Sequence, residues 1–165
     1  MTTAPLSDIK KELAHLEPKE LQDICLRLAK YKKENKELLS YLLFEAHDEA
    51  AYVSQAKTEM DDQFEALPKT NLYLAKKVLR KILRIANKHI KYSGIAQTEL
   101  ELRIYFCASV KQSGIKLQNS QVLVNLFAQQ LKKVDVALGK LPEDLQYDYE
   151  HEIEPLRQYG GSAKK

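Results

Sequence analysis

Residues 71–94 read NLYLAKKVLRKILRIANKHIKYSG and carry the clearest helical pattern in the chain. Thr70 or Asn71 is suited to cap a helix N-terminus, and Gly94 tolerates the left-handed turn that ends one. Between them the apolar residues fall within an arc of about 100° on a helical projection. They are Leu72, Ala75, Leu79, Ile82, Leu83, Ala86 and Ile90. The pattern predicts an amphipathic helix over residues 71–93.

The same segment is strongly basic. From Lys69 to Lys91 it holds eight Lys and Arg residues and no acidic residue. Six of them project from one face, opposite the apolar arc: Lys77, Arg80, Lys81, Arg84, Lys88 and Lys91. Such a face suits phosphates, an acidic partner or an anionic membrane surface, so these six residues form the first candidate binding site.

The preceding segment, residues 36–67, is predicted to form one long helix that ends before Pro68. Its apolar residues step by threes and fours at Leu43, Ala46, Ala50, Val53, Met60, Phe64 and Leu67. The short connection to residues 71–93 predicts a long antiparallel hairpin. This helix carries seven acidic residues between Glu45 and Glu65. We therefore expect them to pair with the basic face, and an open basic face is the alternative.

The rest of the chain is also predicted to be helical. Five Gly and five Pro among 165 residues are few, so long uninterrupted elements are expected. Leu100, Leu102, Ile104 and Phe106 alternate as in a strand, but no second strand can pair with them, which favours a central helix that ends near Gly114. The other predicted helices are 8–16, 18–31, 120–139 and 142–155. The fold class is therefore all-α, with about seven helices in a bundle or irregular array.

We expect a single domain over residues 1–156 and a flexible tail over 157–165. The N-terminus lacks a charged start followed by an apolar run, and no stretch is long enough to span a bilayer. The two cysteines, Cys25 and Cys107, are interpreted as buried, reduced thiols. These features favour a cytoplasmic protein.

Catalytic signatures are missing from the sequence. The four histidines are scattered, no glycine-rich loop could cradle a phosphate, and the nearest metal-binding patterns are incomplete. Those patterns are Asp148-x-x-His151 and Glu45-x-His47. We therefore assign no catalytic residue, metal or cofactor, and keep a helical-bundle enzyme or metal carrier as a remote alternative.

The last predicted helix is acidic, and its strip of Asp148, Glu150, Glu152 and Glu154 forms a second candidate site. Tyr147 and Tyr149 alternate with these residues. The strip suits three roles: docking a basic partner, folding onto the basic helix, or facing solvent.

The opening of the chain carries a family resemblance. Residues 6–13, LSDIKKEL, through 38–43, LLSYLL, resemble the start of a family of small all-helical bacterial proteins of unknown function. The resemblance covers about forty residues and implies no activity. From the residues themselves we expect a non-catalytic protein-interaction module whose partner is a protein. The alternative is a nucleic-acid-binding protein that uses residues 71–93. The sequence specifies neither pathway nor oligomeric state.

Overall fold

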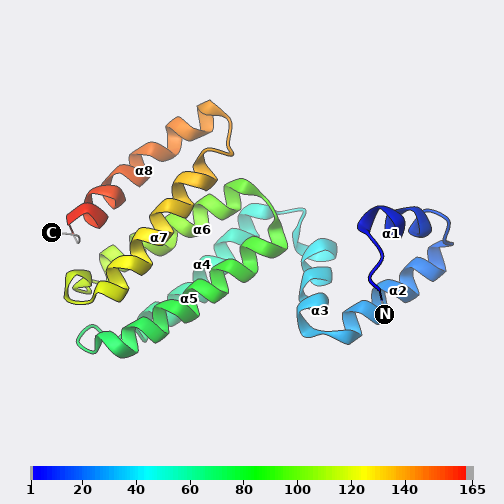
Figure 1. The fold of residues 1–165 in the computed structure, drawn as a ribbon, viewed down its shortest axis with the longest axis horizontal. Coiled ribbons are helices and arrows are strands. Elements are labelled where there is room, and N and C mark those ends of the chain that lie inside the picture. The colour runs from blue at the N-terminus through cyan, green and yellow to red at the C-terminus, as the bar shows by residue number, and fades with distance from the viewer. Residues whose placement is uncertain (1, 163–165) are drawn as a thin grey trace. The chain divides into compact units, whose positions relative to one another are not determined.

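The computed structural model describes residues 2–162 and divides the chain between Glu45 and Ala46 into two compact units, where the sequence suggested one domain. Each unit is described separately (Figure 1). The described residues contain helices and no strand, which confirms the all-α prediction. The first unit holds α1 (Leu6–Leu13), α2 (Pro18–Tyr31), α3 (Lys33–Ser40) and the π-helical turn η1 (Tyr41–Glu45). The second holds α4 (Glu49–Glu65), α5 (Leu72–Ser93), α6 (Ala96–Gln112), the 3₁₀ turn η2 (Leu117–Asn119), α7 (Gln121–Leu138) and α8 (Glu143–Ser162).

Helix α2 begins as its sequence predicts, whereas the turn that follows it does not. Pro18 occupies the first helical position, and the side chain of Glu20 accepts a hydrogen bond of 2.9 Å from the backbone N–H of Glu17. The stretch Lys32-Lys33-Glu34-Asn35 is typical of a turn with Asn35 as the cap of the next helix, but α3 begins at Lys33 and Asn35 lies within its first turn. Asn35 instead donates a hydrogen bond of 2.9 Å to the carbonyl of Leu28, near the end of α2. Its side chain therefore satisfies a free carbonyl at a helix C-terminus.

The long hairpin is confirmed by α4 and α5, but its first helix is shorter than predicted. The prediction of one helix over 36–67 was wrong, because α3 ends at Ser40, the π-helical turn η1 ends at Glu45, and the backbone at Asp48 is not helical. The side chain of Asp48 accepts a 3.0 Å hydrogen bond from the N–H of Ala51 and starts α4 anew. The helical spacing of apolar residues continues across this break through Leu43, Ala46 and Ala50, so the sequence pattern did not reveal that Asp48 caps a new helix. The break explains why residues 2–162 contain eight α-helices where about seven were expected.

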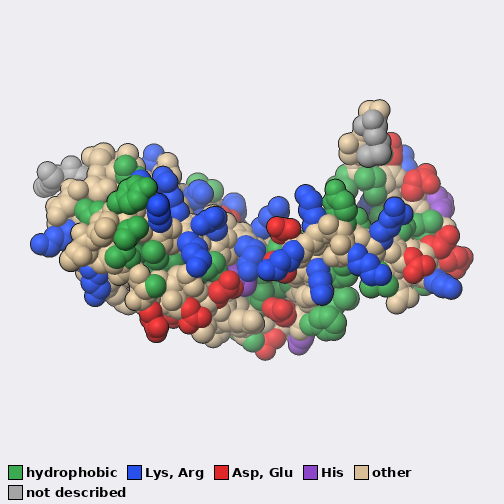
Figure 2. All heavy atoms as spheres, turned by 90° about the horizontal axis from the view of Figure 1, so that it is seen from below, with side chains coloured by type: hydrophobic (Ala, Val, Ile, Leu, Met, Phe, Trp, Pro, Cys, Tyr) green, Lys and Arg blue, Asp and Glu red, His purple; other side chains and the backbone are tan. Residues whose placement is uncertain are grey.

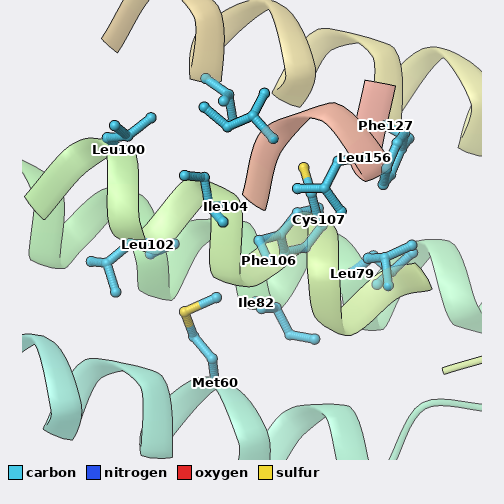
Figure 3. Close-up of a cluster of buried hydrophobic side chains, with 14 of the residues drawn as sticks. Met60, Leu79, Ile82, Leu100, Leu102, Ile104, Phe106, Cys107, Phe127 and Leu156 are labelled. Atoms are coloured by element: carbon cyan, nitrogen blue, oxygen red, sulfur yellow. The ribbon is translucent and has the colours of Figure 1, made fainter. Parts of the chain in front are cut away.

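Helix α6 is the centre of the second unit, as its apolar residues predicted. It packs against α4, α5, α7 and α8, and Leu100, Leu102, Phe106 and Cys107 are fully buried. Figure 3 shows the α6 side chains between Met60 of α4 and Phe127 of α7. Burial on every side removes the one-sided pattern of an amphipathic helix. The alternation that resembled a strand therefore belongs to a helix surrounded by neighbours.

Helix α8 differs most from expectation, because it continues through Pro155 to Ser162. Proline removes one intrahelical hydrogen bond and usually bends or ends a helix. Here Ile153 and Leu156 are both buried, so packing holds the helix on either side of the proline. Residues 157–162, predicted as a tail, extend α8. Residues 163–165, the rest of the predicted tail, lie outside the described residues.

Candidate functional site

The candidate site is the basic surface of α5, which consists of Lys77, Arg80, Lys81, Arg84, Lys88 and Lys91. Capping residues at both ends determine where helix α5, which carries this surface, begins and ends. The side chain of Asn71 accepts a 3.1 Å hydrogen bond from the N–H of Leu74, and Gly94 ends the helix at a φ of 68°. Leu79 and Ile82 on the other face are fully buried. Because the core fixes the rotation of α5, its basic residues point outward.

One of these six residues has an acidic partner. Nζ of Lys88 lies 3.5 Å from Oε1 of Glu59 on α4. Within the described chain the other five are exposed and form no salt bridge: Lys77, Arg80, Lys81, Arg84 and Lys91. The expectation that the acidic residues of α4 neutralise this face is therefore wrong for five of the six. Lys and Arg side chains gather along the second unit in Figure 2, which views that unit from the side of α5.

Asp61 and Glu49 of α4 bind side chains other than the six cations, which helps to explain why the basic surface stays open. The hydroxyl of Tyr105 on α6 donates to the carboxylate of Asp61 and lies 2.7 Å from both of its oxygens. Glu49 accepts hydrogen bonds of 2.5 Å from Ser93 and Thr98. The sequence positions of two residues in a hairpin show whether they lie opposite each other along the helix axes. They do not show in which direction each side chain points. The sequence analysis therefore could not predict the rotation of α4 about its own axis.

A shallow hollow lies on the basic surface, lined by Lys77, Arg80, Leu83, Arg84 and Asn87, with a volume of about 610 Å³. Tyr73, which is 62% exposed, stands one turn before it. Nζ of Lys77 lies 4.6 Å from the centre of the Tyr73 ring. A cation at this distance is attracted to the face of the ring. The surface therefore combines a row of cations with one exposed aromatic ring.

Next to this surface is a buried polar cluster that the sequence analysis missed. Nε2 of His89 lies 2.7 Å from Oε2 of Glu59, and Nδ1 lies 2.9 Å from the hydroxyl of Tyr52. Burial raises the pKa of Glu59, but the hydrogen bond from His89 and the charge of Lys88 together have a larger, opposite effect. The pKa of Glu59 therefore lies below its usual value. The one sequence signal for this cluster was a histidine on the apolar side of α5. The cluster of Tyr52, Glu59 and His89 connects α4 with α5, and its carboxylate also positions Lys88 at the edge of the basic surface.

The acidic strip of α8 is only partly open. Arg157 binds Glu150 at 2.8 Å and Glu154 at 3.7 Å, and the same guanidinium binds Asp135 of α7 at 2.7 Å. Asp148 and Glu152 are exposed, with no salt bridge among the residues described. Helix α8 packs on α6 and α7, on the far side of the second unit from α5 in Figure 1. The idea that this strip folds onto the basic helix is therefore wrong.

A cleft of about 320 Å³, lined by charged, polar and apolar side chains, lies between α4 and α6. Its charged groups already satisfy one another. Glu101 forms a 3.5 Å salt bridge with Lys57 and accepts a 2.8 Å hydrogen bond from the hydroxyl of Tyr149. Among residues 2–162, no group of three or more His, Cys, Asp or Glu side chains is placed to hold a metal ion. The basic surface therefore remains the most distinctive site of this unit.

Comparisons with known proteins give no family for this chain. No protein-family model matches it, and neither a curated protein nor a solved structure shows significant similarity. In the described part of the chain, no helix has the length and apolar character that crossing a membrane requires. The function must therefore be inferred from the site itself.

Proposed function

We propose that this protein is a binding module and that the basic surface of α5 binds the phosphate backbone of nucleic acid. The main support for this proposal is that five of the six cations are exposed and have no acidic partner in the described structure. At about 1.5 Å per residue, Lys77 and Lys91 are about 21 Å apart along the helix. Duplex nucleic acid rises about 3.4 Å per base pair, so the surface matches about six pairs.

The composition of the surface favours nucleic acid over an acidic protein. The cores of protein interfaces are depleted of charged residues, especially Lys, and enriched in apolar and aromatic anchors. Nucleic-acid interfaces are polar and strongly positive. The hollow on α5 has three cations and Asn87 around a single apolar side chain, Leu83. We therefore assign it to phosphates, and sequence-independent contacts are expected because charge dominates the site.

Two further features belong to the proposal. A nucleic-acid ligand and two unpaired cysteines fit the cytoplasmic location expected from the sequence. The protein partner expected from the sequence is assigned to a different surface, in the first unit, which is treated in the next subsection. We propose no catalytic step, since the basic surface binds without supplying a nucleophile or an acid–base pair.

The proposal is tested by fluorescence anisotropy with a labelled duplex RNA and a duplex DNA of the same sequence. The variant Arg80→Glu/Lys81→Glu/Arg84→Glu should weaken binding by at least about tenfold, because three phosphate contacts are lost. The matched control replaces three exposed basic residues elsewhere in the second unit, Lys116→Glu/Lys132→Glu/Lys133→Glu, and changes the net charge equally. Equal losses in both variants would show that bulk charge, rather than α5, governs binding and would contradict the proposal.

A further inference from the structure

The first unit leaves most of its apolar side chains exposed. Among the residues described, the two units hold seventeen exposed large apolar side chains, and eleven of these lie before Ala46. They are Leu6, Ile9, Leu13, Ile24, Leu26, Leu28, Tyr31, Leu38, Leu42, Leu43 and Phe44. Within residues 2–45, Tyr41 is the only buried side chain. Apolar side chains are visible on the surface of this unit, at the right of Figure 2.

A unit of this size needs additional stabilisation. Chains of about 40 residues usually rely on disulfides, a metal or association with another surface. Both cysteines are unpaired, and the described residues offer no metal-binding group. Association is the remaining source of stability. The apolar side chains of α2 and α3 must therefore pack against another surface.

These side chains form two adjoining hollows that share Leu28. One lies between α2 and α3, is lined by Cys25, Ala29, Leu39 and their neighbours, and has a volume of about 250 Å³. The other has a volume of about 540 Å³ and is lined by Ile24, Arg27, Leu28, Lys30 and Tyr31 of α2. Ile24, Leu28 and Tyr31 are 38%, 55% and 75% exposed. The exposed face of α2 therefore has the apolar character of a protein interface.

The second unit does not offer a matching apolar face. Its exposed large apolar side chains are six single residues distributed over several helices and a loop: Tyr73, Leu74, Ile95, Val122, Val136 and Tyr147. Scattered apolar residues of this kind are normal on a protein surface. A second copy of the first unit, in contrast, carries a contiguous apolar face of the same extent.

The charges of α2 specify how two copies would pair. The first half of the helix and its cap carry Glu17, Glu20 and Asp23 against Lys19. The second half carries Arg27 and Lys30 and no acid. On a helical projection, Glu20, Ile24, Arg27, Leu28 and Tyr31 share an arc of about 100°. An antiparallel partner therefore brings the acidic half of one helix opposite the basic half of the other.

We propose that the protein forms a two-fold symmetric dimer in which α2 of one copy packs antiparallel on α2 of the other. The two-fold axis passes beside Ile24, and Glu20 of each copy pairs with Arg27 of the other copy. The same patch then serves both partners, as an isologous interface requires. This dimer is independent of nucleic-acid binding, since it uses neither α5 nor any other residue of the second unit.

The oligomeric state of the full chain tests the proposal by analytical ultracentrifugation. The wild type should sediment as a dimer, and Ile24→Lys should raise its dissociation constant by at least about thirtyfold. Val136→Lys, at a 62% exposed residue of α7, should leave the dimer intact. A monomeric wild type at micromolar concentration would overturn the proposal, as would a dimer that is insensitive to Ile24→Lys.

Charge exchange tests the antiparallel arrangement. Glu20→Lys and Arg27→Glu should each weaken the homodimer, whereas mixing the two variants should restore dimers that contain one copy of each. Glu20→Gln retains the side-chain acceptor of the helix cap and loses the charge, so it separates folding of α2 from pairing. Mixed dimers no tighter than the two homodimers would exclude this register.

Cross-linking identifies what covers the face. In a Cys25→Ser/Ile24→Cys variant, a bismaleimide should join two copies, while buried Cys107 stays unreactive. A monomer whose introduced thiol is protected would show that the chain covers its own face and would overturn the proposal.

Discussion

Nε2 of His89 lies 2.7 Å from Oε2 of Glu59, and Oε1 of the same carboxylate lies 3.5 Å from Nζ of Lys88. A single acidic side chain of α4 thus engages two consecutive residues of α5. It neutralises one cation of the basic surface and anchors the hairpin from the buried side. The other five cations of the surface, Lys77, Arg80, Lys81, Arg84 and Lys91, stay available for a ligand.

Glu59→Ala should lower the free energy of unfolding by about 1 kcal/mol at neutral pH, because His89 and Lys88 lose their partner and the pair is partly screened. The pKa of Glu59 is lowered by folding from an ordinary value of 4.5. Its contribution is therefore complete above about pH 5 and is lost as pH falls through the lower, folded pKa. Urea unfolding of both proteins across this range measures the difference. Asp62→Ala, an exposed change on the same helix, should cost less than about 0.5 kcal/mol, and an equal loss there would contradict the assignment.

Leu79→Ala and Ile104→Ala should each cost roughly 2–5 kcal/mol, because both leave a cavity in the core of the second unit. Leu79 is fully buried and Ile104 is 5% exposed. Leu74→Ala, at a 45% exposed residue of α5, provides the matched control and should cost far less. Urea denaturation gives the three values. Losses below about 1 kcal/mol at both core residues would show that the packing is wrong.

Two adjacent glycines test whether α8 continues past Pro155. A methyl group at Gly160 would lie 2.6 Å from Cδ1 of Leu131 and 3.2 Å from Cε1 of Phe127, whereas one at Gly161 would meet nothing within 4 Å. Gly160→Ala should therefore destabilise the protein by about 1–3 kcal/mol through overpacking. Gly161→Ala should be neutral or stabilising, since alanine favours the helix. Equal thermal stability of the two variants would argue against a docked C-terminal helix.

The native protein should expose one reactive thiol. Burial raises the pKa of Cys107 to about 12, so this thiol stays protonated and inaccessible at pH 8. Cys25 is exposed. Ellman's reagent should titrate one thiol per chain before denaturation and two afterwards, and Cys25→Ser should abolish the first reaction. Rapid reaction of both native thiols would contradict the buried position of α6.

The helices were predictable where local signals were complete. Asn71 and Gly94 lie at the two ends of α5, and a single-faced apolar pattern runs between them. The continuation of α8 past Pro155 was not predictable, because it depends on tertiary packing of Ile153 and Leu156. The break at Asp48 was concealed by apolar spacing that continued through it.

The candidate site was predictable in its members but not in its surroundings. All six cations were identified by spacing, whereas their pairing depends on the rotation of α4 about its axis. That rotation directs Asp61 to Tyr105 and Glu49 to Ser93 and Thr98 rather than to the basic side chains of α5. Cys25 was interpreted as buried, because its helix carries an apolar stripe, yet it is exposed. Helix α3 packs on α2 but leaves Ile24, Cys25 and Leu28 exposed.

Salt dependence of binding tests the central claim most directly. Each phosphate neutralised by a cation contributes about −0.9 to the slope of log affinity against log salt concentration for duplex DNA. The five cations without an acidic partner in the described structure predict a slope between about −4 and −5. The dissociation constant at physiological salt should be about 10⁻⁴–10⁻⁶ M. A slope shallower than about −2, or no binding even at low salt, would contradict a phosphate-binding role for α5.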